Sequence, residues 1–197
     1  MATKIILDLC GGTGAWSYPY KKAGYDVRNV TLPDYDVGTY TSPKNVYGIL
    51  SAPPCPMFSF ARTNAKEPRD LRAGMEIVIA CLRIIWECQY QLRKDTQKKS
   101  PLKFWVLENP KGMLGWFLGE PTFVFNPYDY GDNYKKKTCL WGCFNIPKKQ
   151  PIDCDKPKFD RLLTKEINYQ GNEHLGRTER RAITPPKFAQ AFFKSNR

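Results

Sequence analysis

The sequence predicts an α/β protein built on a mainly parallel sheet, and three observations lead to this fold class. Several short runs are nearly all apolar, which is the pattern of strands buried on both faces. Strand and helix patterns alternate along the chain, as they do when crossover helices connect parallel strands. The 197 residues are enough for one well-buried domain and too few for two ordinary ones, so we expect a single domain over residues 1–197.

The individual elements follow from local pattern, in chain order. Residues 4–8 form an apolar run that ends in an acid, and the glycine-rich residues 10–14 lead into a helix over 15–23. A β-branched run at 26–32 is closed by Pro33, and an apolar run at 47–52 is stopped by two prolines, so both are strands. Pro68 and Asp70 open a helix with apolar residues at i+3 and i+4, namely Leu71, Met75, Val78, Leu82 and Ile85. The apolar run 104–107 is the fourth strand.

The charge balance favours a polyanionic partner. The chain carries 31 Lys and Arg against 19 Asp and Glu, a net charge of +12. Residues 1–131 contribute +4 and residues 132–197 contribute +8, so the excess is concentrated in the last third. Clustered Lys and Arg neutralise phosphates and release condensed counterions. This favours nucleic acid over a merely solubilised surface, without separating DNA from RNA.

Composition excludes several other classes. With 42% hydrophobic and 25% charged residues, the chain is neither disordered nor a coiled coil. Its longest mainly apolar stretch, 75–86, is interrupted by Glu76 and Arg83 and is shorter than the roughly 20 residues that span a bilayer. We expect no membrane segment, and no signal peptide precedes the first strand. A cytoplasmic protein with seven cysteines is expected to keep them as free thiols.

Residues suited to chemistry follow the ends of three predicted strands. They are Asp8, Gly12, Gly14, Pro54, Cys55, Glu108 and Asn109. Ligands of open α/β sheets bind outside the carboxyl ends of the strands. We therefore expect one crevice to hold all of these residues.

The glycine-rich loop carries the first of several family resemblances. The segment Asp8-Leu9-Cys10-Gly11-Gly12-Thr13-Gly14-Ala15-Trp16-Ser17 resembles D-L-F-x-G-x-G-G-F-S, the S-adenosylmethionine (SAM) loop of the cytosine-5 DNA methyltransferases. It is not a phosphate loop, since no Gly-Lys-Ser/Thr follows. The family's acid after the second strand is absent; Asp34 and Asp36 are the two candidate substitutes, and Asp36 is the one expected near the adenine. The resemblance implies a SAM site formed by Asp8, Leu9, Cys10, Gly12, Gly14, Trp16, Asp36 and Pro53.

A second segment supplies a candidate nucleophile. Ala52-Pro53-Pro54-Cys55-Pro56-Met57-Phe58-Ser59 resembles the family's G-P-P-C-Q-x-F-S, departing at Ala52 and Pro56. Carbon 6 of cytosine is a poor electrophile, and a soft thiolate can add to it and later leave. The resemblance implies that Cys55 is the nucleophile and that Pro54 and Ser59 contact the substrate. The cysteines in or beside apolar elements, Cys10, Cys81 and Cys88, are expected to be structural.

A third segment supplies an acid. Glu108-Asn109-Pro110 resembles the family's E-N-V motif, whose glutamate lies on the Watson–Crick edge of the flipped base. An acid at ring nitrogen 3 draws the ring toward an iminium-like form that a thiolate can attack. A closed site should raise the pKa of Glu108 so that it can donate a proton. Asn109 is expected to contact the substrate.

Two C-terminal segments extend the resemblance. Residues 133–142, with Lys135 and Lys137 in place of two arginines, resemble Q-x-R-x-R followed by an apolar strand, which in the family braces the flipped nucleotide. Residues 184–193 loosely resemble the last motif, which closes over SAM. Where the family inserts a target-recognition domain, this chain has only the basic residues 143–180, which we expect to hold phosphates. Cys139, Cys143, Cys154 and His174 lack the spacing of a zinc site, so no metal is expected.

These resemblances imply a short member of the cytosine-5 DNA methyltransferases, similar to phage-encoded forms. The implied fold is the SAM-dependent Rossmann-like methyltransferase fold, with helices on both faces of the sheet. The implied reaction is methyl transfer to carbon 5 of cytosine in DNA, either single-stranded or a duplex with a flipped cytosine. Cytosine in RNA or a free nucleotide, and a non-catalytic accessory that binds SAM or nucleic acid, are the alternatives. A homodimer or partner protein could supply specificity, in the cytoplasm of a bacterial or phage-infected cell.

Overall fold

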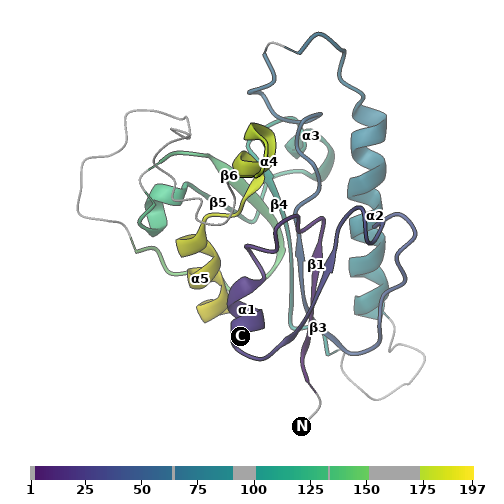
Figure 1. Cartoon of the computed structure of the whole chain (residues 1–197), viewed down its shortest axis with the longest axis vertical. Coiled ribbons are helices and arrows are strands. Elements are labelled where there is room, and N and C mark those ends of the chain that lie inside the picture. Colours follow the sequence, from purple (N-terminus) through teal and green to yellow (C-terminus); the bar gives the residue numbers. More distant parts are fainter. Residues whose placement is uncertain (1–2, 64, 91–100, 133, 151–173) are drawn as a thin grey trace.

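The centre of the protein is a six-stranded sheet in the order β2-β1-β3-β4-β6-β5 (Figure 1). The structure, a computed structural model, describes residues 3–63, 65–90, 101–132, 134–150 and 174–197. The parallel strands are β2 (Asp26–Val30), β1 (Ile5–Leu9), β3 (Val46–Ser51) and β4 (Phe104–Pro110). Strand β6 (Thr138–Cys143) runs antiparallel to β4, and the short β5 (Phe123–Phe125) runs antiparallel to β6. The predicted α/β class with a mainly parallel sheet is confirmed.

Helices cover both faces of this sheet (Figure 1). The long helix α2 (Leu71–Tyr90) packs on one face, and α1 (Tyr18–Lys22) and α5 (Pro186–Ser195) pack on the other. The short helices α3 (Gly115–Leu118), α4 (Arg177–Ala182) and η1 (Pro127–Tyr130) lie in the connections. Along β1, Ile6 joins the core on the α1 and α5 side, whereas Leu7 and Leu9 join the core under α2. Successive side chains of a strand point to opposite faces, so an all-apolar strand contributes side chains to the core on each face.

Aromatic rings connect the beginning of the described chain with its end. Trp16, directly after the glycine loop, contacts Phe188 and Phe192 of α5, with ring centroids 6.0 and 5.6 Å apart. The Tyr20 hydroxyl donates to the carbonyl oxygen of Asn196 at 3.2 Å. Tilted and edge-to-face pairs of this kind contribute about 0.5–1.5 kcal/mol each beyond area burial. Helix α5 therefore fixes the position of the segment that follows the glycine loop.

Element boundaries differ from the prediction by two or more residues in three places. The strand predicted over 26–32 ends earlier, since β2 stops at Val30. The helix predicted over 15–23 is wrong at its start, because a turn closed by the Tyr18 N–H and the Gly14 carbonyl, 2.9 Å apart, precedes α1. Strand β4 continues past Leu107 to Pro110, since its last three residues pair with β6. Neither the turn nor the strand pairing leaves a periodic signal in the sequence. The short elements β5 and α3 were not predicted.

The strand order creates a topological switch point beside β1. From β1 the chain passes to β2 on one side, and β3 lies on the other side of β1. The loops that follow β1, β3 and β4 therefore leave the same edge of the sheet at a topological switch point, where α/β proteins bind ligands.

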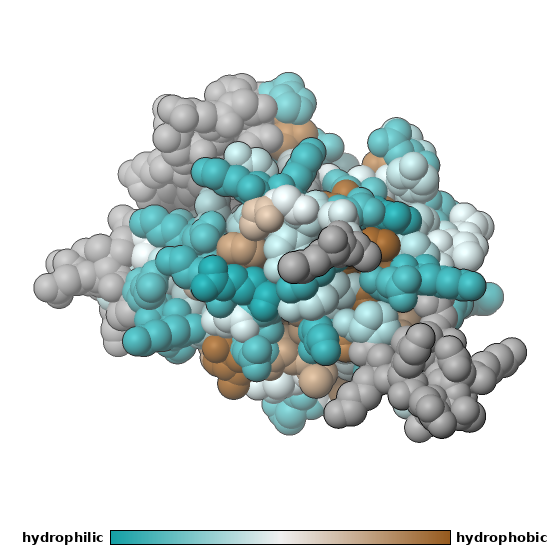
Figure 2. Space-filling view, turned by 90° about the horizontal axis from the view of Figure 1, so that it is seen from below, coloured by the Kyte–Doolittle hydropathy of each residue, from teal (hydrophilic) through white to brown (hydrophobic). Residues whose placement is uncertain are grey.

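The opposite end of the molecule, below the amino ends of the parallel strands in Figure 1, is mainly hydrophilic. Figure 2 shows this end, and its apolar side chains form small separate spots. Within the described residues, no helix is both long enough and apolar enough to cross a membrane.

Gly142 is the position where one added methyl group should cost the fold most. Its φ is +142°, and a Cβ there would overlap the carbonyl oxygen of Trp105 on the neighbouring strand. Backbone of the sheet centre cannot move aside, so we expect Gly142→Ala to lower the free energy of unfolding by at least about 2 kcal/mol. The shift in urea midpoint measures this loss. Gly115→Ala is the control: a Cβ meets nothing within 4 Å there, and a change below about 1 kcal/mol is expected.

Candidate active site

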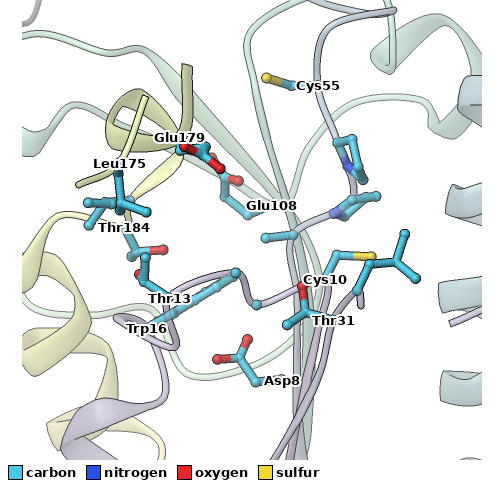
Figure 3. A pocket seen from close by; sticks show the side chains of 18 of the residues that line it. Asp8, Cys10, Thr13, Trp16, Thr31, Cys55, Glu108, Leu175, Glu179 and Thr184 are labelled. Atoms are coloured by element: carbon cyan, nitrogen blue, oxygen red, sulfur yellow. The ribbon is translucent and has the colours of Figure 1, made fainter. Parts of the chain in front are cut away.

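A cavity of about 450 Å³ opens at the carboxyl ends of β1, β3 and β4 (Figure 3). This volume is in the range of sites for small molecules and cofactors. The glycine loop, the proline-cysteine loop and the end of β4 form three of its walls, and α4 with its flanking residues closes another. Figure 3 shows Asp8 and Cys55 at opposite ends of the cavity, with Glu108 between them. The cavity therefore has room for two ligand groups, one beside each end.

The glycine loop presents backbone to the cavity. Gly12 and Gly14 have φ of 52° and 71°, in the region that residues with a Cβ rarely adopt. At Gly11 a Cβ would overlap the side chains of Asp8 and Asn29. The Asn29 amide also donates to the Gly12 carbonyl at 2.9 Å. The loop thus lies directly on two polar side chains from β1 and β2.

Asp8 is the fully buried acid beneath this loop. One of its carboxylate oxygens accepts a hydrogen bond from the Ser17 hydroxyl, and the other has no partner within the described part of the chain. Burial raises the pKa of Asp8 to about 6, although the bond from Ser17 acts in the opposite direction. A buried carboxyl group with one unsatisfied oxygen therefore lines the cavity. Such an oxygen suits a cationic or hydrogen-bond-donating ligand group.

Cys55 lies in a loop that several hydrogen bonds hold in place. The Asn109 amide, buried in β4, donates to the carbonyl of Pro53 at 2.9 Å. The Arg69 guanidinium donates to the carbonyls of Met57 and Ser59, at 2.9 Å each. These contacts fix the backbone on both sides of the Cys55 thiol. The burial and the charge of Glu108 raise the pKa of this thiol, whereas Lys136 and Arg181 partly offset the shift.

Glu108 faces the cavity from the end of β4. Burial raises the pKa of its carboxyl group, and the nearby Lys136 ammonium acts in the opposite direction. A raised pKa keeps a carboxyl group protonated at higher pH, which is the property required of a proton donor. The charge of Glu108 raises the pKa of the Cys55 thiol, and Lys136 acts on both groups, so the two groups share one electrostatic environment.

Of the three adjacent lysines at 135–137, Lys136 lines the cavity. Its Nζ donates to the carbonyl of Arg181 at 3.3 Å, which joins the start of β6 to the end of α4. The resemblance selected its neighbours, Lys135 and Lys137, for substrate contacts, and neither of them lines the cavity. Lys137 is exposed, and its backbone carbonyl accepts a bond from the N–H of Lys111.

About half of the residues selected from the sequence line the cavity. Those lining it are Asp8, Cys10, Gly12, Trp16, Pro53, Pro54, Cys55 and Glu108. Those that do not line it are Leu9, Gly14, Asp36, Ser59, Asn109, Lys135 and Lys137. Leu9 belongs to the core under α2, and the Asp36 carboxylate accepts the N–H of Gly38 at 2.8 Å. Asn109 and Ser59 hold the Cys55 loop and do not line the cavity themselves.

Several lining residues were not selected from the sequence. They are Thr13, Thr31, Leu32, Lys136, His174, Glu179 and Thr184. Thr31 and Leu32 directly follow β2, which ends at Val30; the strand predicted over 26–32 contained both of them, so the rule of strand ends pointed beyond them. Thr184 opens the segment 184–193 that resembles the family's last motif, whereas no pattern in the sequence connects Glu179 with β1. The carboxylate of Glu179 accepts the N–H of Gly176 at 2.6 Å, at the start of α4.

The influence of Lys136 on the thiol can be tested directly. Replacing its ammonium by an uncharged side chain removes a charge that favours the thiolate. We therefore expect Lys136→Met to raise the pKa of Cys55, measured from the pH dependence of iodoacetamide alkylation. Lys135→Met is the matched control, and it should leave this pKa within about 0.3 units. Equal pKa values in the Lys136→Met variant and the wild type would contradict the assignment.

Two predictions, that the cysteines are free thiols and that no metal is bound, involve residues that the structure describes only in part. The six cysteines described are free, and Cys10 Sγ lies 4.0 Å from Cys81 Sγ. Among the described residues, no three His, Cys, Asp or Glu side chains lie together in a group that could hold a metal ion. Cys154 and most of the basic segment 143–180 lie outside the described residues.

Comparison with solved structures finds distant likenesses in fold. No protein-family model matches this chain, and no curated protein sequence matches it. A solved structure of the methyltransferase EhMeth of Entamoeba histolytica superposes with a TM-score of 0.39 at 9% sequence identity. The alignment covers 76% of this chain and 56% of that protein. A likeness this distant assigns no family, substrate or activity to the chain.

Proposed function

We propose that this protein transfers a methyl group from SAM to carbon 5 of cytosine in nucleic acid, through a covalent bond to Cys55. The observation that carries the proposal is the shared cavity of Cys55, Glu108 and the glycine loop. A nucleophile, a proton donor and a loop for a cofactor occupy one site, although they come from three different strands. The motif resemblances to the cytosine-5 DNA methyltransferases select the same three groups.

The glycine-loop end of the cavity fits SAM. The unsatisfied oxygen of Asp8 suits the ammonium of its methionine part, and the glycines allow close approach of backbone to ligand. Trp16 and Cys10 add apolar surface beside the loop. When bound, SAM supplies an electrophilic methyl group on a sulfonium ion.

The opposite end of the cavity suits a cytosine that has left its stack. The Cys55 thiolate forms a bond to carbon 6, while the Glu108 carboxyl group donates a proton to ring nitrogen 3. Carbon 5 then has the electron density needed to take the methyl group. Solvent water then takes the proton from carbon 5, and the electron pair of that C–H bond forms the double bond between carbons 5 and 6 as the bond between carbon 6 and sulfur breaks. The sulfur leaves with its electron pair as the thiolate, and nitrogen 3 returns its proton to Glu108, which restores the aromatic ring.

The decisive experiment incubates the protein with methyl-labelled SAM and four acceptors in parallel: duplex DNA, single-stranded DNA, RNA and dCMP. Label should appear in 5-methylcytosine of at least one acceptor. The same acceptor carrying 5-fluorocytosine should form a SAM-dependent covalent adduct, because fluorine blocks the elimination that frees Cys55. Label on nitrogen or oxygen, or binding of SAM without transfer to any acceptor, would overturn the proposal in favour of another methyltransferase or a non-catalytic accessory.

A further inference from the structure

Three exposed aromatic side chains lie on the two loops that follow Cys55 and Glu108. The aromatic patch consists of Phe60 and, on α3, Trp116 and Phe117, with exposed fractions of 52%, 71% and 48%. The ring centroids of Phe60 and Trp116 lie 6.2 Å apart, and Phe117 lies at the same distance from the buried ring of Phe58. Large apolar side chains gathered in this way indicate a binding surface, whereas single exposed ones do not.

The aromatic patch lies on the two loops that carry the proposed catalytic pair. Phe60 follows Cys55 in the loop after β3, and α3 follows Glu108 at the end of β4. Ser59 and Gly112 form an isolated β-bridge between these loops. The N–H of Met113 also donates to the carbonyl of Phe58 at 2.8 Å. The patch is therefore fixed in position relative to the Cys55 end of the cavity.

Positive charge lies on the same two loops. Lys111 is exposed between β4 and α3, and its N–H donates to the Lys137 carbonyl at 2.8 Å, which places it beside the run 135–137. Arg62 and Arg69 donate to backbone carbonyls, so no carboxylate neutralises them through these bonds. Within the described residues, none of these cations belongs to an ion pair.

The acids of this surface are few. Glu67 and Asp70 lie in the same loop as Arg62, and Glu120 is exposed after α3. The Asp70 carboxylate accepts the N–H of Ala73 at 2.8 Å, where it caps the start of α2. The surface therefore combines aromatic faces with a positive balance. This combination is typical of proteins that bind unpaired nucleic acid, where bases stack on the rings and phosphates lie beside cations.

We propose that the aromatic patch and Lys111 bind an unpaired nucleic-acid strand, with bases next to the target cytosine stacked on Trp116 and Phe60. This inference rests on the proposed function for its target base, and it names the substrate class of that site. In a duplex, neighbouring bases cover each other's faces and leave none for the rings. A free nucleotide has no second base to reach the patch. An unpaired strand provides both the base faces and the phosphates.

The test measures binding of fluorescein-labelled dT12 to the full chain by anisotropy. This probe contains no cytosine, so binding does not depend on methyl transfer. Trp116→Ala should weaken binding about tenfold, equivalent to about 1.4 kcal/mol, and Trp116→Phe should retain most of the affinity. Lys111→Met should reduce the salt slope by about 0.7, the value for one phosphate contact to a single strand. Two further probes are measured in the same way. U12 distinguishes binding of RNA from binding of DNA. The dA12·dT12 duplex has no unpaired bases, so Trp116→Ala should leave the affinity for it within twofold of the wild type.

Trp86→Ala is the matched control. Trp86 is 62% exposed on α2, outside the two loops, and its removal should leave affinity for dT12 unchanged. The inference is overturned if Trp116→Ala binds dT12 like the wild type, or if Trp86→Ala weakens binding equally. It is also overturned if sedimentation shows a dimer that Trp116→Ala dissociates with no change in affinity for dT12. Binding that depends on Trp116 in a protein without methyl transfer would refute the proposed function and leave this inference standing.

Discussion

Cys55→Ala is expected to abolish methyl transfer, with turnover at least about a thousand-fold below the wild type. Without the sulfur, no bond to carbon 6 can form, and carbon 5 stays a poor nucleophile. Binding of SAM should survive, because the glycine loop and Asp8 lie at the other end of the cavity. Labelled methyl transfer to the active acceptor and calorimetric titration of SAM measure the two quantities separately.

Cys143→Ala is the matched control for this substitution. Cys143 is an exposed free thiol at the end of β6, and its loss should change turnover less than twofold. Residual turnover of the Cys55→Ala variant within tenfold of the wild type would exclude a covalent cysteine mechanism.

Glu108→Gln is expected to lower turnover by about 10²–10⁴, the usual contribution of a positioned proton donor. Glutamine keeps the size of the side chain and can still donate a hydrogen bond, but it cannot transfer a proton to nitrogen 3. Single-turnover rates at saturating SAM measure the loss. Glu120→Gln, an exposed acid after α3, is the control and should leave the rate within twofold.

The pH profile of this variant provides an independent check. In the wild type, the rate should fall at low pH as the Cys55 thiolate is lost and at high pH as Glu108 loses its proton, which gives a bell. The charge of Glu108 raises the pKa of Cys55, so its removal must lower that pKa. The rate of the Glu108→Gln variant should therefore rise with pH to a plateau. The pH of its half-maximal rate should lie below the pKa of the Cys55 thiol that alkylation measures in the wild type. A bell-shaped profile in the variant would contradict the role of Glu108.

The fold was predictable where burial alone determines the pattern. The apolar runs that became β1, β3 and β4 and the periodic face of α2 are local signals, and their elements lie where expected within a few residues. The extension of β4 to Pro110, the strand β5 and the late start of α1 depend on pairing partners and on one turn. The strand pairings join residues distant in the chain, so no short window of sequence contains both partners, whereas the turn from Gly14 to Tyr18 is local but has no periodic pattern.

The candidate site was predictable to the extent that strand ends define it. Asp8, Cys55 and Glu108 each follow or end a parallel strand, and the sheet brings them to one cavity. The choice of Lys135 and Lys137 over Lys136 came from motif alignment, and the cavity is lined by the middle lysine. Which of three adjacent lysines turns inward depends on how the chain enters β6 and on its bond to Arg181. A linear motif carries no such information.

The packing of Trp16 on α5 has a consequence for synthesis on the ribosome. Trp16 is made early, and its partners Phe188 and Phe192 are among the last residues of the chain. At the roughly 5–20 residues per second of translation, the interval between them is on the order of ten to thirty seconds. Throughout that time strand β1 already precedes the glycine loop, but the aromatic packing of Trp16 on α5 is absent. The nascent chain therefore completes the glycine-loop wall of the cavity only after α5 has emerged.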